Sequence, residues 1–204
     1  MSAEVIIVSG LPRSGTSLMM QMLDSGGVEV VTDNVRTADT DNPRGYYEFE
    51  AVKRTRQDPS WLPQARGKAV KMVSQLLYDL PPDERYRVIF MERDVAEMLL
   101  SQEKMLQRLG RAAVPREQMR QAYAVHLERL HAWLGRQRNM AVLRVSYNEL
   151  VEWPEREARR ASEFLGGKVC VNGMTRSVDP SLYRNRMAPG GLEGPQGPPS
   201  AHGL

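Results

Sequence analysis

The sequence predicts a three-layer α/β/α fold, in which helices cover both faces of a central parallel sheet of about five strands. Two observations lead to this prediction. Short apolar runs rich in β-branched residues recur along the 204-residue chain, and segments with a helical spacing of apolar residues lie between them. Strands that alternate with helices of this length imply right-handed crossovers and hence a parallel sheet. A ligand of such a sheet binds at the carboxyl ends of its strands.

The predicted strands are the short apolar runs themselves. Their length fits strands that are buried on both faces of a sheet. The runs are Val5–Val8, Val28–Val31, Ala69–Val73, Val88–Met91 and Ala141–Val145.

Four helices are predicted from apolar periodicity and from helix-terminal residues. The first directly follows the loop after Val8, and the second has an apolar stripe from Val95 to Leu109. Pro115 and Pro154 open the third and fourth helices, because proline is favoured at the first helical position. The pair Gly166-Gly167 ends the fourth helix.

The chain is expected to form one α/β domain over residues 1–187, because two domains of this total length would both be small. Residues 32–67 interrupt the alternation of strands and helices, being rich in Asp, Asn, Pro, Gly and Arg, and we expect an irregular loop region that contacts a substrate. Residues 188–204 are mostly Gly and Pro with few large apolar side chains, and we expect a disordered tail.

Composition excludes several classes of protein. An apolar content of 41% and a charged content of 26% are ordinary for a globular protein. No apolar run approaches the roughly 20 residues that span a bilayer, and the first strand begins too early to leave room for a signal peptide. We therefore expect a cytoplasmic protein without membrane contact. The sequence does not indicate an oligomeric state.

Charge and cysteine usage narrow the range of ligands. Cys170 is the single cysteine, so an internal disulfide is excluded, and the three histidines lack a convincing ligand spacing. We therefore expect no metal site. The net charge of +3 is mild, and no basic tract is interleaved with aromatic residues, so nucleic acid is not an expected partner.

The loop after the first strand has the pattern of a P-loop-type phosphate-binding loop. Gly10 and Gly15 have the spacing G-x-x-x-x-G, which wraps backbone N–H groups around an anion at the start of a helix. We call residues 10–17 the cradle loop. A P-loop that hydrolyses ATP or GTP has Lys after the second glycine, whereas this chain has Thr16, and Arg13 is the only cation in the loop. The loop is therefore expected to bind a phosphate without acting as a standard triphosphatase.

A second anion site is predicted after the strand Val88–Met91. Arg93 follows the end of this strand, and Ser101 comes eight residues later in the next predicted helix. At about 1.5 Å per residue, the hydroxyl lies about two turns into that helix, near enough to share an anion with the guanidinium.

The cradle loop, the Arg93 and Ser101 pair and the segment Leu143–Leu150 together resemble the signature of sulfotransferases that use 3′-phosphoadenosine 5′-phosphosulfate (PAPS). The resemblance extends from residue 5 to about residue 166. It implies PAPS as sulfuryl donor and 3′-phosphoadenosine 5′-phosphate (PAP) as product. It also implies that Arg93 and Ser101 bind the 3′-phosphate and that Tyr147 lies near the adenine. The residues implied to bind the 5′-phosphosulfate are Arg13, Ser14, Gly15, Thr16 and Ser17.

The chain departs from this family at two places. Cytosolic small-molecule sulfotransferases have a Lys-Thr-His segment with His as catalytic base, whereas Lys71-Met72-Val73 stands here, so Lys71 remains and the His is missing. The family's glycine-rich C-terminal segment is also missing. In its place Asp179–Arg186 is similar to the ends of bacterial sulfotransferase-like proteins, and we expect Arg184 and Arg186 to close over the 3′-phosphate.

In other branches of the family a carboxylate is the base, so the resemblance implies an acidic residue here, and Glu48, Glu50 and Asp33 are the candidates. We favour Glu48, because Pro43 and Gly45 predict a turn that presents it and the neighbouring tyrosines can wall a pocket.

The predicted reaction is metal-independent sulfuryl transfer to a hydroxyl or amine of a small-molecule or saccharide acceptor. Arg13 and the loop amides would hold the leaving 5′-phosphate, Lys71 would stabilise the transferring oxygens, and Glu48 would act as the base. One alternative is a P-loop nucleotide or small-molecule kinase, which the missing lysine and the lack of a Walker-B aspartate disfavour. The other is a non-catalytic nucleotide-binding module that has lost its base.

Overall fold

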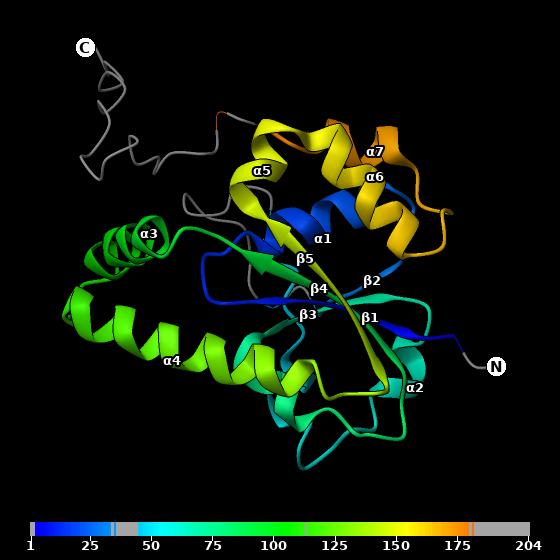
Figure 1. Cartoon of the computed structure of the whole chain (residues 1–204), viewed down its shortest axis with the longest axis horizontal. Coiled ribbons are helices and arrows are strands. Elements are labelled where there is room, and N and C mark those ends of the chain that lie inside the picture. Colours follow the sequence, from blue (N-terminus) through cyan, green and yellow to red (C-terminus); the bar gives the residue numbers. More distant parts are fainter. Residues whose placement is uncertain (1–2, 34, 36–44, 113, 180, 182–204) are drawn as a thin grey trace.

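A five-stranded parallel sheet forms the centre of the protein (Figure 1). The computed structural model describes residues 3–33, 35, 45–112, 114–179 and 181. Within these residues the strand order is β2-β3-β1-β4-β5. The strands are β1 (Val5–Gly10), β2 (Val30–Val31), β3 (Ala69–Val73), β4 (Tyr86–Glu92) and β5 (Met140–Ser146). The sheet and the helices on its two faces confirm the predicted fold class.

The register of the sheet places the predicted functional segments at the carboxyl ends of neighbouring strands. All six residues of β1 are buried, so this strand occupies the middle of the sheet. At its carboxyl end Gly10 lies between Val73 of β3 and Met91 of β4. The cradle loop therefore begins between the strand that carries Lys71 and the strand that ends just before Arg93.

The four predicted helices are present, together with shorter helical segments that were not predicted. The predicted ones are α1 (Thr16–Ser25), α3 (Val95–Arg108), α4 (Arg116–Leu134) and α6 (Pro154–Phe164). The additional segments are α2 (Leu62–Ala65), α5 (Tyr147–Glu152), α7 (Val171–Arg176) and the 3₁₀ helices η1 (Glu50–Arg54) and η2 (Ser74–Asp79).

The part of residues 32–67 that the structure describes is more ordered than the expected irregular loop region. It contains η1 and α2, and Val52, Trp61 and Leu62 are buried against the sheet. The Trp61 indole N–H donates to Thr55 Oγ1 at 3.1 Å. A few large apolar side chains thus anchor this segment, although they are too widely spaced to produce a periodic pattern.

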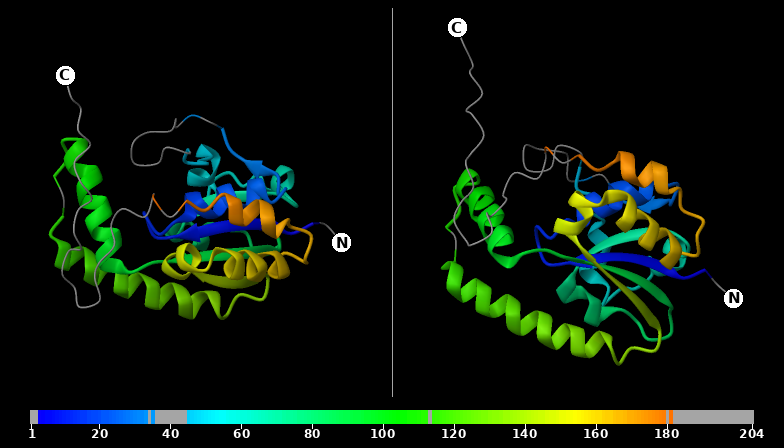
Figure 2. Two further views of the ribbon diagram at one scale, coloured as in Figure 1. Left: turned by 90° about the horizontal axis from the view of Figure 1, so that it is seen from above. Right: turned by 45° about the horizontal axis from the view of Figure 1, so that its top comes forward.

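Two apolar layers cover the two faces of the sheet. On one face α1, α5, α6 and α7 pack against side chains such as Val8 and Ile89 (Figure 1). On the other face α2, η2 and the C-terminal half of α4 pack against Ile7, Val88 and Phe90. The helices α3 and α4 extend beyond the sheet on the side where β4 ends (Figure 2). A smaller cluster around Leu11 joins these two helices to the cradle loop.

Helix α1, which starts in the cradle loop, is fixed at its C-terminal end by α7. A Cβ on Gly173 would lie 2.1 Å from the Ser25 carbonyl oxygen, and a Cβ on Gly26 would lie 2.6 Å from Val169 Cγ1. The Cys170 N–H donates to the Gly26 carbonyl at 2.9 Å. The two glycines therefore permit a backbone contact that leaves no room for a side chain.

Some predictions concern residues outside the described ranges. These residues are 36–44, which include Pro43, together with Arg184, Arg186 and the tail 188–204. Within the described ranges, no helix combines the length and the apolar character that a membrane crossing requires.

Candidate functional site

The cradle loop adopts a conformation that depends on its two glycines. A Cβ on Gly10 would lie 2.4 Å from Ser14 Oγ and 2.6 Å from the Met91 carbonyl oxygen. Gly15 has φ 100° and is the N-cap of α1, and a Cβ there would lie 2.3 Å from the Tyr147 ring. Arg13 also has a positive φ, at 69°. Only glycine fits at either end of this loop.

The loop brings backbone N–H groups to the start of α1. No side chain caps this helix, and its first turn contains no acidic residue, so the first amides and the positive end of the helix dipole are left for a ligand. The Ser14 hydroxyl is buried and has no hydrogen-bond partner among the described residues. A buried polar group without a partner is unfavourable, and an anion at the helix start would satisfy groups of this kind.

Arg93 lies directly after β4 and is held from three sides. Its Nε donates to Glu97 Oε2 at 3.1 Å, its Nη1 donates to the Arg13 carbonyl at 3.4 Å, and its guanidinium lies over the Tyr147 ring at 4.4 Å. The Arg93 side chain is only 8% exposed. The structure thus brings a nearly buried cation against the cradle loop.

Arg13 connects the two predicted anion subsites. Its Nε donates to Ser101 Oγ at 3.1 Å, and its carbonyl accepts the bond from Arg93. Ser101 lies in α3 and is 2% exposed. Arg13 therefore contacts both of the residues that are predicted to share an anion. The side chains predicted for the 3′-phosphate and the 5′-phosphosulfate form one cluster.

Lys71 of β3 reaches the other side of the cradle loop. Its ammonium donates to the Tyr46 carbonyl and to Ser17 Oγ at 3.4 Å, and it lies 3.8 Å from Glu48 Oε1. Its side chain is 11% exposed. A nearly buried ammonium is unfavourable unless it is paired, which explains why the segment around Tyr46 and Glu48 folds onto β3.

The three candidate carboxylates have different surroundings. Glu48 is beside Lys71, as described, whereas Glu50 forms an exposed ion pair with Lys53 at 2.6 Å. Asp33 accepts hydrogen bonds from the N–H groups of Glu50 at 2.6 Å and Val35 at 3.1 Å. The bond from Glu50, more than any other interaction, lowers the pKa of Asp33 from its ordinary value. A carboxylate with a lowered pKa is a weaker base, which disfavours Asp33. Glu48, beside Lys71, stays the predicted base.

Tyr147 packs at the junction of the subsites. It begins α5, is buried, and places its ring between Gly15 and Arg93. The ring therefore supports both the glycine at the start of α1 and the cation after β4. Its predicted position near an adenine stays a prediction.

Glu97 and Asn148 belong to this cluster, although the sequence did not single them out. Glu97 is buried in the first turn of α3, and Asn148 Nδ2 donates to its Oε2 at 3.3 Å. The available signal was the i, i+4 spacing of Arg93 and Glu97 across a helix start. Asn148 gave no local signal, because only tertiary folding brings α5 to α3.

A small cavity lies next to the cluster, on the side of α4. Its volume is about 200 Å³, and its lining includes Leu11, Ser14, Phe90, Arg93 and Leu127. Most of the lining is apolar, and Ser14, Glu92 and Arg93 are its polar members.

The arrangement presents two sets of groups that suit anions. One set has the first amides of α1, Arg13 and Lys71, and the other has Arg93 and Ser101, which Arg13 also contacts. Among the described residues, no group of three or more His, Cys, Asp or Glu side chains is placed to hold a metal ion. Arginine and backbone amides bind phosphates well through charge-assisted hydrogen bonds.

Comparison with solved structures returns several similar proteins. A sulfotransferase domain from the curacin biosynthetic pathway has a TM-score of 0.50 and 16% identity, covering 80% of this chain and 74% of that chain. At this identity the likeness is one of fold. A sulfotransferase from Alicyclobacillus acidocaldarius has a TM-score of 0.47 and 19% identity, covering 81% of this chain and 82% of that one.

A sugar kinase from Janibacter sp. HTCC2649 has a TM-score of 0.41 and 14% identity, covering 88% of this chain and 98% of that chain. TM-scores of 0.47 and 0.41 are too low to carry an argument. No curated protein matches the chain.

A family model described as the sulfotransferase family matches residues 74–169. This range includes Arg93, Ser101 and Tyr147, and it excludes the cradle loop and Lys71. The predicted 3′-phosphate side of the site is thus the part that the family model covers. Over residues 74–169 the chain is therefore similar to the sulfotransferase family, and its fold is similar to that of a sulfotransferase domain.

Proposed function

We propose that the protein transfers a sulfuryl group from PAPS to a hydroxyl or amine of an acceptor. The observation that carries this proposal is the connection of two anion subsites through Arg13, whose side chain contacts Ser101 and whose carbonyl contacts Arg93. A ligand with two phosphate-type groups on one adenosine matches such a pair of subsites. A nucleotide with a single chain of phosphates does not need a second anion subsite.

The chemistry of the residues fits this ligand. The amides at the start of α1, the Ser14 hydroxyl and Arg13 would receive the 5′-phosphosulfate. Arg93 and Ser101 would bind the 3′-phosphate, with Arg184 and Arg186 as further proposed contacts. Tyr147 would support the adenosine beside Arg93.

In the proposed reaction, PAPS supplies a sulfuryl group whose bond to the 5′-phosphate breaks as a bond to the acceptor forms. Lys71 would neutralise negative charge on the transferring oxygens, and Arg13 would stabilise the phosphate that leaves. Glu48 would accept the proton of the acceptor hydroxyl or amine. The 3.8 Å between Glu48 and Lys71 supports their shared position at the reacting group.

A thermal-shift experiment tests the nucleotide assignment. PAP in the presence of EDTA is expected to raise the Tm of the protein, because a ligand that binds only the folded state stabilises it. ATP with magnesium is expected to give a much smaller shift, because the cradle loop has Thr16 where a kinase has lysine. AMP serves as the control that lacks the 3′-phosphate.

The outcomes separate this proposal from the kinase alternative. A larger shift with ATP and magnesium than with PAP would favour the kinase. Equal shifts with PAP and AMP would remove the 3′-phosphate subsite from the proposal. Sulfuryl transfer itself is then measured with ³⁵S-labelled PAPS and a panel of acceptors.

The remaining details of the assignment are also proposals. We propose a small-molecule or saccharide acceptor, a reaction without a metal ion, and a cytoplasmic location. Residues 32, 33, 35 and 45–67, with Glu48, are the described part of the segment that we propose to contact the acceptor.

A further inference from the structure

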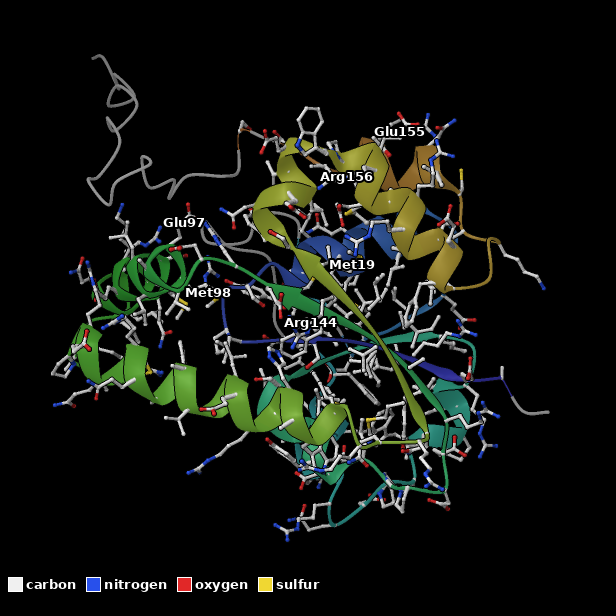
Figure 3. All side chains as sticks on the ribbon, in the orientation of Figure 1. Met19, Glu97, Met98, Arg144, Glu155 and Arg156 are labelled. Atoms are coloured by element: carbon white, nitrogen blue, oxygen red, sulfur yellow. The ribbon has the colours of Figure 1, made fainter. Side chains whose placement is uncertain are left out.

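We infer that Glu97 is a positioning residue for recognition of the 3′-phosphate, and this inference rests on the proposed function. Glu97 is an acidic side chain inside a site for an anion, where its own charge is unfavourable for the ligand. Its contacts explain its presence, because it orients the guanidinium of Arg93. Figure 3 labels Glu97 at the start of α3, next to Met98, which packs toward α4.

The first step of the argument is the position of the Glu97 carboxylate. The backbone N–H of Glu97 donates to Asp94 Oδ1 at 3.0 Å, so Glu97 is fixed in the first turn of α3. Its Oε2 accepts from Arg93 Nε at 3.1 Å and from Asn148 Nδ2 at 3.3 Å. The carboxylate thus ties together the end of β4, α3 and α5.

The second step is the burial of the ion pair. The side chains of Glu97 and Arg93 are 4% and 8% exposed. Exposed ion pairs contribute little, whereas removal of one partner from a buried pair leaves an uncompensated charge. The ion pair of Glu103, also on α3, lies nearer the surface, because the side chain of its partner Arg116 is 53% exposed.

The third step is the direction that the contacts give to Arg93. Glu97 holds its Nε, the Arg13 carbonyl accepts from its Nη1, and the Tyr147 ring lies against its plane. A planar guanidinium that is bound at Nε and stacked on one face has lost most of its rotational freedom. Because less ordering is then needed when the ligand binds, the Arg93 side chain is preorganised for a phosphate.

The experiment measures how strongly the protein prefers PAP over AMP, which differ only in the 3′-phosphate. Calorimetric titration gives both Kd values for the unchanged protein and for Glu97→Ala, Arg93→Ala and the double variant. Glu97→Ala is expected to reduce the ratio of the AMP Kd to the PAP Kd by about tenfold. In the Arg93→Ala background, Glu97→Ala is expected to leave the ratio unchanged, because its effect passes through Arg93.

Two further variants guard against a purely structural explanation. Glu97→Gln keeps the size and one acceptor oxygen, so it is expected to fold and to lose less of the preference. Glu103→Ala removes a carboxylate from the same helix at the surface, and it is expected to keep the full preference. A role in folding alone would weaken PAP and AMP binding equally and leave the ratio intact.

The results that would overturn the inference differ from the result that would contradict the proposed function. An unchanged or increased ratio in Glu97→Ala and Glu97→Gln overturns the inference; an increase would mean that repulsion of the phosphate outweighs positioning. A ratio near one in the unchanged protein would instead contradict the proposed function. A loss of preference in Glu97→Ala that persists in the Arg93→Ala background also overturns the inference.

Discussion

At the scale of single residues, Glu48 and Lys71 define the proposed reacting end of the site. Their charged groups lie 3.8 Å apart, and Lys71 also contacts Ser17 at the start of α1. The pair combines a carboxylate that can accept a proton with a cation that can neutralise transferring oxygens.

Glu48→Gln is predicted to abolish sulfuryl transfer and to leave the Kd for PAP nearly unchanged. The amide keeps the shape of the side chain but cannot act as a base. Turnover with ³⁵S-labelled PAPS and calorimetric titration with PAP check the two parts separately.

The matched control for Glu48→Gln is Glu50→Gln, which removes a carboxylate two residues away that pairs with Lys53. This variant is predicted to keep its activity. Normal turnover in Glu48→Gln, or its loss in Glu50→Gln alone, would contradict the choice of Glu48.

Gly15→Ala is predicted to weaken PAP binding and to lower the Tm. The new Cβ would lie 2.3 Å from the Tyr147 ring at a residue whose φ is 100°, so both a clash and backbone strain arise. Gly110→Ala is the control, since its φ is also positive at 64° but no atom lies within 4 Å of the new Cβ. Equal losses in the two variants would show that strain alone is responsible. Thermal unfolding and PAP titration measure the effects.

The sequence predicted the residues whose role depends on local pattern. The glycine spacing indicated the cradle loop, and the step from an apolar strand to Arg93 indicated a cation at the edge of the sheet. Glu97 was visible only as a possible partner of Arg93, because its burial and its bond from Asn148 depend on how α5 packs against α3. Tertiary contacts of this type leave no periodic signal in the sequence.

At the scale of elements, α5 is the helix that connects β5 to the site. It starts at Tyr147 immediately after the strand, and the Ser146 side chain accepts from the Glu149 N–H at 3.3 Å. The pair Ser146 and Glu149 has the spacing of a capping box, which is a signal for a helix start. This signal was present in the sequence, although the helix is only six residues long and shows no apolar period.

Ser146→Ala is predicted to destabilise the protein by about 1 kcal/mol, because an N-cap residue satisfies an otherwise unpaired helix amide. For a chain of this size the Tm is expected to fall by about 2–4 °C. Ser146→Asp retains a capping oxygen and is predicted to keep the Tm. Unfolding of the two variants, followed by circular dichroism, makes the comparison, and equal Tm values would refute the role of the cap.

The strands were easier to predict than the short helices. Buried parallel strands are continuous apolar runs, and all five appear close to their predicted bounds, with β2 reduced to Val30–Val31. The short helices α2 and α7 have no complete amphipathic turn pattern. They exist because residues such as Trp61 and Met174 pack into the two apolar layers.

At the scale of the whole molecule, histidines in α4 link stability to pH. His126 Nε2 lies 2.9 Å from Ser74 Oγ, and the ring of His131 packs edge-on against Phe90. Burial is the main cause that lowers the pKa of both residues from the ordinary value. Each histidine therefore binds a proton more readily in the unfolded chain than in the folded one.

The free energy of unfolding is predicted to decrease as the pH falls from about 7.5 to about 5.5. A lowered folded pKa gives stability that is present above the unfolded pKa of about 6.5 and is lost below it. Carboxylates with lowered pKa values, such as Glu84 and Glu103, change the free energy of unfolding only at a lower pH. Denaturant unfolding at several pH values measures the slope. The double variant His126→Gln with His131→Gln should flatten it, and an unchanged slope would exclude these histidines.

The helix that begins in the cradle loop is fixed at both ends. The Tyr147 ring packs on Gly15 at its start, and the backbone of α7 lies against Gly26 at its end. Such a helix has little freedom to tilt or to slide. The entropy of aligning its amides was therefore lost when the chain folded, and the nucleotide that we propose as ligand would meet dipoles that are already aligned.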